Sequence, residues 1–143
     1  MQEKKRVRDI MSTRLCTCTP TEKVKNAARL MSTYDIGCVA VCNKDGMCTG
    51  ILTDRDLVVR CHASDGDTSK MTVGEVMSEA PEKIAPDATL GEAIRKMGEH
   101  QIRRLPVEDH GRLVGMISIG DIARHSACDT EIGSLEIAIA ERN

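Results

Sequence analysis

The sequence predicts a mixed α/β fold (α+β) in which two copies of one β-α-β-β-α unit follow each other along the chain. Three observations support this prediction. The chain has 143 residues, which is enough to bury a core. It contains an internal repeat, and both copies show the same order of apolar patterns.

The repeat is clearest in the segment VRDIMS (Val7–Ser12), which matches VGEVMS (Val73–Ser78) at an offset of 66 residues. The offset holds as far as Val41 and Val107. After a turn it becomes 65, which pairs Gly50 with Gly115 and Asp56 with Asp121. Because turns tolerate changes of length, a shift confined to a turn indicates a true duplication.

Each copy begins with a short strand and a helix. Pro20 and Pro86 are followed by the expected capping residues, Thr21 and Asp87. Apolar residues then recur at helical spacing: Val24, Ala27, Ala28 and Met31 in the first copy, and Leu90, Ala93, Ile94 and Met97 in the second.

Two β-rich runs joined by a turn follow each helix. The runs are residues 38–41 and 50–52 in the first copy, and residues 105–107 and 113–117 in the second. The turns Asp45-Gly46 and His110-Gly111 make hairpins plausible. A second helix is expected to begin near Thr53 and near Ser118.

These patterns predict a first repeat over residues 7–62, a polar linker over 63–72, a second repeat over 73–126 and a helical tail over 127–143. A unit of about 60 residues has a marginal core by itself, so we expect the two units to pack together.

Composition excludes several classes of protein. The 20 basic and 22 acidic residues give a net charge of -2, unlike the strong basic excess of a nucleic-acid-binding domain. No apolar run approaches the roughly 18 residues of a membrane span. The charged start, MQEKKRVRDIM, has no apolar signal region, which predicts a cytoplasmic location. Since Tyr34 is the only aromatic residue, the core must be aliphatic, filled out by Met and Cys.

Taken together, the residues resemble a known family. The opening motif V-x-[DE]-[IV]-M-S, the strand RRLPV and the motif G-h-[ILV]-[ST]-x-x-D resemble the cystathionine β-synthase (CBS) domain. Two in tandem resemble a CBS pair, or Bateman module, similar to small free-standing bacterial CBS-pair proteins. The resemblance extends from Val7 to His125.

The resemblance implies two repeats packed sheet to sheet with pseudo-two-fold symmetry, leaving two clefts. It implies a non-enzymatic regulatory module with no required cofactor. Its ligand would be an adenosine-containing molecule: AMP, ADP, ATP, S-adenosylmethionine or a dinucleotide. CBS pairs also commonly form homodimers and signal to a protein effector. Some bind no nucleotide, so the activity does not follow from the fold.

The ligand prediction depends on a repeated hydroxyl and carboxylate: Thr53 with Asp56, and Ser118 with Asp121. A carboxylate can accept from both ribose hydroxyls, while the hydroxyl and the start of the following helix suit a phosphate. The same spacing is typical of a helix capping box, and the two interpretations are compatible.

Further site residues follow from the resemblance. Ile36, Gly37, Cys38 and Val39, and Ile102 and Leu105 with Pro106, would line an adenine slot. Arg103 and Arg104 suit a phosphate, as does Arg55 in the first repeat, which has Gly37 and Cys38 in place of the two arginines. We therefore expect the second repeat to bind better. The alternative for Arg103 and Arg104 is a solvated edge or an ion pair with Glu99, Glu108 or Asp109.

The 7 cysteines lack the paired C-x-x-C spacing of a zinc site, so we expect buried apolar thiols and no metal site. Cys61-His62 is a weak candidate for a nucleophile pair, because neighbours on a helix point apart. The sequence has no motif of a phosphate loop, zinc protease or serine hydrolase. The alternatives to a ligand sensor are a stress-associated interaction protein with empty clefts and, more weakly, a thiol redox sensor.

Overall fold

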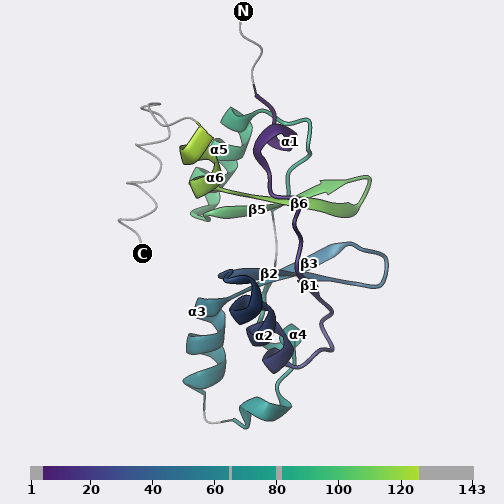
Figure 1. The fold of residues 1–143 in the computed structure, drawn as a ribbon, viewed down its shortest axis with the longest axis vertical. Helices are drawn as coiled ribbons and strands as arrows, with labels where there is room; N and C mark the ends of the chain where they lie inside the picture. The colour runs from purple at the N-terminus through teal and green to yellow at the C-terminus, as the bar shows by residue number, and fades with distance from the viewer. Residues whose placement is uncertain (1–4, 65, 80–81, 126–143) are drawn as a thin grey trace, which may run out of the picture. The chain divides into compact units, whose positions relative to one another are not determined.

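Both β-α-β-β-α repeats are present in the computed structural model, which describes residues 5–64, 66–79 and 82–125 (Figure 1). The first repeat contains α1 (Val7–Ile10), β1 (Thr17–Cys18), α2 (Val24–Tyr34), β2 (Cys38–Cys42), β3 (Cys48–Thr53) and α3 (Asp54–Asp56), which continues as a π-helix (Leu57–His62). After a 3-10 turn (Thr68–Lys70), the second contains α4 (Val73–Val76), β4 (Ser78–Glu79), α5 (Leu90–His100), β5 (Arg104–Asp109), β6 (Arg112–Ser118) and α6 (Ile119–His125). The predicted mixed α/β class is confirmed, with a short helix added in front of each repeat.

The chain divides into two compact units, and each unit contains residues of both repeats. Within the described residues, unit 1 comprises residues 5–14, 82–110 and 114–125, and unit 2 comprises residues 15–64, 66–79 and 111–113. The repeats thus exchange their opening segments: α1 belongs with the second repeat's helices and hairpin, and α4 belongs with those of the first.

Backbone hydrogen bonds hold each exchanged helix in place. In unit 1, the Val7 N–H donates to the Ala88 carbonyl at 2.8 Å. In unit 2, the Val73 N–H donates to the Glu22 carbonyl at the same distance. These four residues are related by the offset of 66 seen in the sequence, so the duplication extends to single hydrogen bonds.

The sheets repeat the same register. Unit 2 has the strand order β1-β2-β3-β4, with β1 parallel to β2 and the other pairs antiparallel. The parallel pair Cys18 and Val41 has its counterpart in an isolated parallel bridge between Ile84 and Val107. The antiparallel pair of β3 and β4, Ile51 with Ser78, has its counterpart in a bridge between Ser12 and Met116. The counterpart of β1 in the second repeat is therefore reduced to the one bridge at Ile84.

The predicted helix caps were wrong by two residues in both repeats. The N-cap residues are Lys23, which makes no side-chain cap bond, and Thr89, whose Oγ1 accepts from the Glu92 N–H at 3.2 Å. The residues after Pro20 and Pro86 cannot start a helix, because carbonyls in these segments accept the backbone N–H groups of α1 and α4. Ala28, expected on the apolar face of α2, is exposed.

Two glycines explain how the opening motif packs. A Cβ at Gly50 would lie 2.5 Å from Met77 Sδ and 2.9 Å from the Ser78 carbonyl oxygen. A Cβ at Gly115 would lie 2.6 Å from Met11 Sδ and 3.0 Å from the Ser12 carbonyl oxygen. The Met-Ser that ends each opening motif thus needs a glycine on the neighbouring strand, since no side chain fits between them.

Each unit has its own aliphatic core, as the composition predicts. The core cluster of unit 1 consists of Val7, Ile10, Ile84, Ala93, Ile94, Met97, Leu105, Val107, Ile117, Ile119 and Ile122. The core cluster of unit 2 consists of Cys18, Val24, Ala27, Met31, Val39, Val41, Leu52, Cys61, Val73 and Val76. The exchanged helices contribute to both cores, through Val7 and Ile10 in unit 1 and Val73 and Val76 in unit 2.

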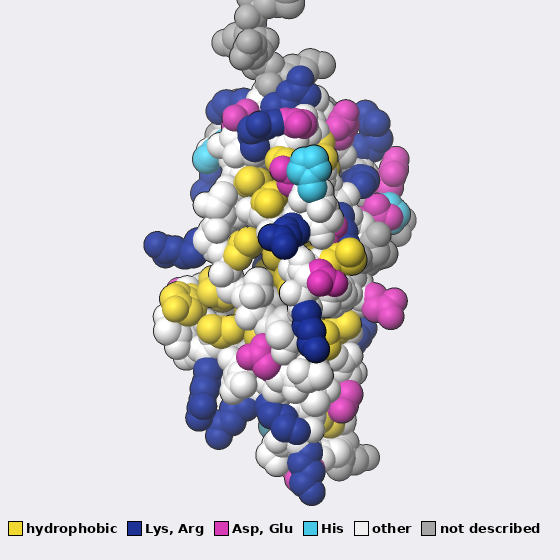
Figure 2. Space-filling view, turned by 90° about the vertical axis from the view of Figure 1, so that its right-hand side faces the viewer, with side chains coloured by type: hydrophobic (Ala, Val, Ile, Leu, Met, Phe, Trp, Pro, Cys, Tyr) yellow, Lys and Arg dark blue, Asp and Glu magenta, His cyan; other side chains and the backbone are white. Residues whose placement is uncertain are grey.

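Figure 2 shows basic and acidic side chains interspersed over the face in view. Among the described residues, no helix is long and apolar enough to cross a membrane. The helix predicted for the tail, residues 127–143, lies outside the described residues.

Candidate functional site

The first candidate pair, Thr53 and Asp56, forms a complete capping box where β3 passes into α3. The Asp56 N–H donates to Thr53 Oγ1 at 3.1 Å, and the Thr53 N–H donates to Asp56 Oδ2 at 3.0 Å. Capping is therefore a real role of this motif. It occupies one carboxylate oxygen with a single bond and leaves the Asp56 Oδ1 atom for other partners.

Asp56 is the one buried charged or polar residue among those that the structure describes, at 8% exposure. Its Oδ1 accepts from the Ser78 hydroxyl at 3.3 Å and lies 3.8 Å from Arg60 Nε. Arg60 also donates from Nη1 to the Met77 carbonyl at 3.1 Å. The carboxylate thus lies among a backbone donor, a hydroxyl and a guanidinium, an environment suited to an anion.

The second pair, Ser118 and Asp121, forms the same box in unit 1. The Asp121 N–H donates to Ser118 Oγ, and the Ser118 N–H donates to Asp121 Oδ2, each at 3.0 Å. Asp121 Oδ1 accepts from Arg124 on the same helix. The Asp121 side chain is 19% exposed and the Asp56 side chain 11%, so the second carboxylate is the more accessible.

The predicted adenine segments lie next to these boxes. The Asp54 N–H donates to the Gly37 carbonyl at 2.9 Å, and Cys38 is the strand partner of Thr53. In unit 1 the Ile119 N–H donates to the Arg103 carbonyl, also at 2.9 Å. The structure thus brings residues 36–39 to the first box and residues 102–104 to the second. We call these groupings the unit 2 half-site and the unit 1 half-site.

The residues of these segments differ in accessibility. Ile36, Gly37, Cys38 and Ile102 are partly exposed, whereas Val39, Leu105 and Pro106 are buried. Buried side chains belong to the packing beneath each half-site. A ligand could reach only the partly exposed residues and the backbone of the segments.

The predicted phosphate-binding arginines lie at or near the surface. Arg55 and Arg103 are exposed and Arg104 is half-buried. Of the three acids weighed as their partners, Glu108 lies 3.0 Å from Lys83 Nζ and Asp109 lies 3.5 Å from His110 Nε2. Within the described residues no ion pair involves Arg103 or Arg104.

The sequence interpretation missed two residues of the unit 2 half-site, Ser78 and Arg60. Ser78 ends the second copy of the opening motif, and that motif was visible in the sequence. Its contact with Asp56 was not, because it depends on the exchange of opening segments. Arg60 follows Asp56 by four residues, a spacing at which helical side chains meet.

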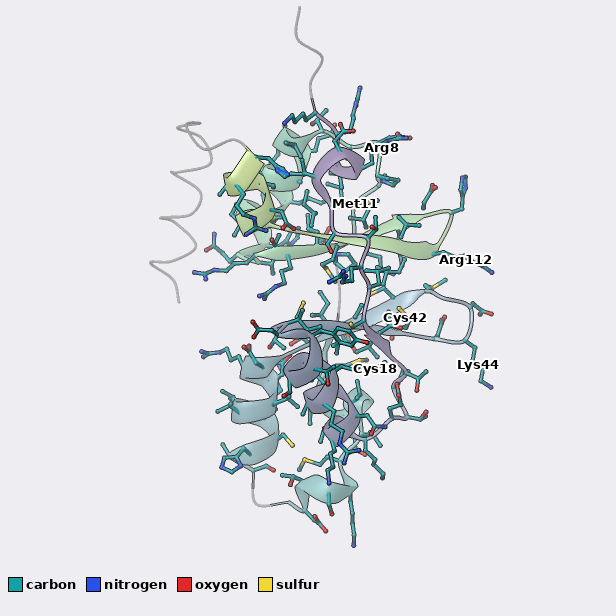
Figure 3. The ribbon with its side chains drawn as sticks, in the orientation of Figure 1. Arg8, Met11, Cys18, Cys42, Lys44 and Arg112 are labelled. Atoms are coloured by element: carbon teal, nitrogen blue, oxygen red, sulfur yellow. The ribbon has the colours of Figure 1, made fainter. Side chains whose placement is uncertain are left out.

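Among the cysteines that the structure describes, only Cys38 belongs to a half-site. Cys18 and Cys42 help to line a cavity of about 280 Å³ in unit 2, with Thr17, Glu22 and Lys44. Figure 3 labels Cys18, Cys42 and Lys44. Burial, together with the Glu22 carboxylate, raises the pKa of the Cys18 thiol from 9.0 to about 11. Among the described residues no three His, Cys, Asp or Glu side chains are grouped to hold a metal ion.

Comparison with known proteins supports the resemblance. The CBS domain profile matches residues 7–62 and 73–127. The chain is 36% identical over 137 residues to the CBS domain-containing protein YhcV of Bacillus subtilis, covering 96% of each chain. It is 37% identical over 118 residues to hypoxic response protein 1 of Mycobacterium tuberculosis, covering 82% of each.

Two solved structures share the fold. A crystal structure of hypoxic response protein I with two coordinated zinc ions has a TM-score of 0.77 at 36% identity, covering 85% of this chain and 98% of that one. The CBS domain pair of protein MJ0100, in complex with 5'-methylthioadenosine and S-adenosyl-L-methionine, has a TM-score of 0.77 at 25% identity, covering 87% and 98%. The chain therefore belongs to the CBS domain family, as a tandem pair of CBS domains.

Proposed function

We propose that this protein is a non-enzymatic sensor that binds an adenosine-containing ligand and responds by changing a dimer or partner interface. The observation that supports the proposal is the duplicated capping box. In each unit the carboxylate of the box lies beside the partly exposed start of a strand. AMP, ADP, ATP, S-adenosylmethionine and dinucleotides all present the same ribose and adenine to it. The adenosyl ligands of the MJ0100 pair are support by analogy.

The chemistry of each half-site suits this ligand class. A ribose diol would donate to the carboxylate oxygen that the cap leaves available, Oδ1 of Asp56 or of Asp121. The backbone of Gly37 or Arg103, already held near the helix start, lies where an adenine edge could be met. In unit 1 the exposed Arg103 and half-buried Arg104 offer positive charge to a phosphate.

Isothermal titration calorimetry of nucleotide-free protein with AMP, ATP and S-adenosylmethionine tests the proposal. We expect heat from at least one ligand, lost in the double variant Asp56→Asn, Asp121→Asn and kept in Glu99→Gln, which changes an exposed carboxylate on α5. Asparagine retains a capping oxygen, so the double variant should fold. No heat from any ligand at millimolar concentration contradicts the proposal.

A second candidate is an interaction protein that binds no small ligand. The complete capping boxes favour it, because Thr53, Asp56, Ser118 and Asp121 have a role without any ligand. A thermal-shift screen separates the two, since a ligand at 100 times its dissociation constant adds about 2.7 kcal/mol of stability. Sedimentation with and without the ligand then shows whether binding changes the predicted homodimer.

A further inference from the structure

The two half-sites differ in what surrounds the carboxylate, and the difference lies in the opening segment of the second repeat. In unit 2 that segment is tied to Asp56 twice. The Ser78 hydroxyl lies 3.3 Å from Asp56 Oδ1 and 3.5 Å from Oδ2. Arg60 joins the two by placing Nε 3.8 Å from Asp56 Oδ1 and donating from Nη1 to the Met77 carbonyl.

The counterpart in unit 1 is built differently. Asp121 meets Arg124, which is on the same helix and is 70% exposed in its side chain. The position that corresponds to Arg60 is His125, and the residue that corresponds to Ser78 is Ser12, which is exposed. Within the described residues, neither the Asp121 carboxylate nor Arg124 bonds to the opening segment of the first repeat. The tie between the carboxylate and an opening segment is therefore particular to unit 2.

We propose that Arg60 and Ser78 form an intramolecular latch that occupies Asp56 in the ligand-free protein and competes with the ligand for it. The proposal rests on the proposed function, because it assumes that the Asp56 carboxylate accepts from a ligand. A ribose that takes Asp56 Oδ1 displaces the hydroxyl and the guanidinium. The unit 2 half-site then binds more weakly than it would without the latch, and its occupancy frees the segment Met77–Glu79 from Asp56.

The strength of the latch suits a reversible switch. Arg60 is 52% exposed in its side chain, and solvent weakens ion pairs at such positions. The Ser78 contact is long for an O–H donor to a carboxylate. Both bonds are thus weak enough for a ligand to break. The segment that they hold continues into the pairing of Ser78 and Glu79 with β3, so its release would loosen the edge of the unit 2 sheet.

The competition is measured by calorimetry with AMP in an Asp121→Asn background, where the unit 2 half-site is observed alone. We expect Arg60→Gln to tighten AMP binding about fivefold, the upper range for an exposed ion pair. Ser78→Ala should tighten AMP binding less than Arg60→Gln does. The affinity of Arg60→Lys should lie between those of Arg60→Gln and the parent, because lysine keeps the charge but lacks the planar guanidinium that can donate to two acceptors at once. Arg29→Gln, an exposed arginine on α2, is the matched control and should leave affinity unchanged.

The latch itself is measured without ligand by hydrogen exchange of the peptide that contains Met77 to Glu79. Arg60→Gln should speed exchange there, and Arg29→Gln should not. Unchanged exchange in Arg60→Gln overturns the latch. Faster exchange with unchanged AMP affinity would show that Arg60 does not compete with the ligand. Faster exchange with weaker AMP binding would show that Arg60 contacts the ligand instead. No AMP heat in any variant overturns the proposed function instead, while exchange still decides the latch.

Discussion

Met77 Sδ lies against Gly50 so closely that a Cβ on the glycine would be 2.5 Å from the sulfur. Gly115 and Met11 have the same relationship in unit 1, at 2.6 Å. One glycine and one methionine thus fix each opening segment to the hairpin of the other repeat. The contact explains why the methionine of the opening motif and the glycine of the G-h-[ILV]-[ST]-x-x-D motif occur together in both copies.

Replacing Gly50 by alanine should destabilise the fold by about 1–3 kcal/mol, because the new methyl group meets the Ser78 backbone as well as the Met77 side chain. Urea denaturation measures the loss. Gly91→Ala is the control: Gly91 lies in α5 with its nearest neighbour at 3.8 Å, so alanine should stabilise by about 0.5–1 kcal/mol. Equal effects of the two substitutions would contradict the close-contact explanation.

Thr89→Ala should lower the free energy of unfolding by about 1 kcal/mol, because it removes the oxygen that caps α5. Thr21→Ala, at the cap position that the sequence predicted for α2, should cost less than about 0.5 kcal/mol, as an exposed side chain outside the helix. The midpoints of chemical unfolding compare the two. A larger loss from Thr21→Ala would restore the original cap assignment.

Cys18 should be alkylated slowly by iodoacetamide near pH 8, because its pKa of about 11 leaves little thiolate. Glu22→Gln removes one cause of the raised pKa and should speed labelling at Cys18, as followed by peptide mass spectrometry, whereas Glu99→Gln should not. The folded thiol holds its proton more tightly than the unfolded one. Its contribution to stability is therefore present below pH 9 and is lost as the pH rises toward 11.

Asp121→Asn should weaken adenosyl-ligand binding by about tenfold or more, because a charged acceptor is lost. Arg55→Gln should weaken it less, since Arg55 is exposed and belongs to the half-site that we expect to bind less well. Calorimetry with the tightest ligand ranks the two variants. The reverse order would assign the stronger site to unit 2.

The repeat and the apolar periodicity were enough to predict the β-α-β-β-α order, because both signals are local and occur twice, but not the short helix in front of each repeat. The helix starts were misplaced since Pro20-Thr21 and Pro86-Asp87 resemble caps locally. Their neighbouring carbonyls are bonded to distant helices, and no local pattern reports such bonds.

The candidate site was likewise predictable only where its residues are close together in the sequence. The Thr53 and Ser118 boxes were found because their residues are three apart. The role of Ser78 beside Asp56 joins residues 22 apart through an exchanged segment, and it required the structure. The predicted binding roles of Thr53, Asp56, Ser118 and Asp121 remain predictions.

The exchange of opening segments bears on how such a chain could arise and be divided. A polypeptide that contained only one repeat would have an opening helix that packs on another copy, and it would lack the helix that completes its own unit. Its natural route to a complete fold would be two copies trading those helices, so fusion of such a swapped pair would produce the present arrangement. Residues 7–62 and 73–127 should therefore be unable to fold as monomers when produced separately, and a mixture of the two should form the complete fold.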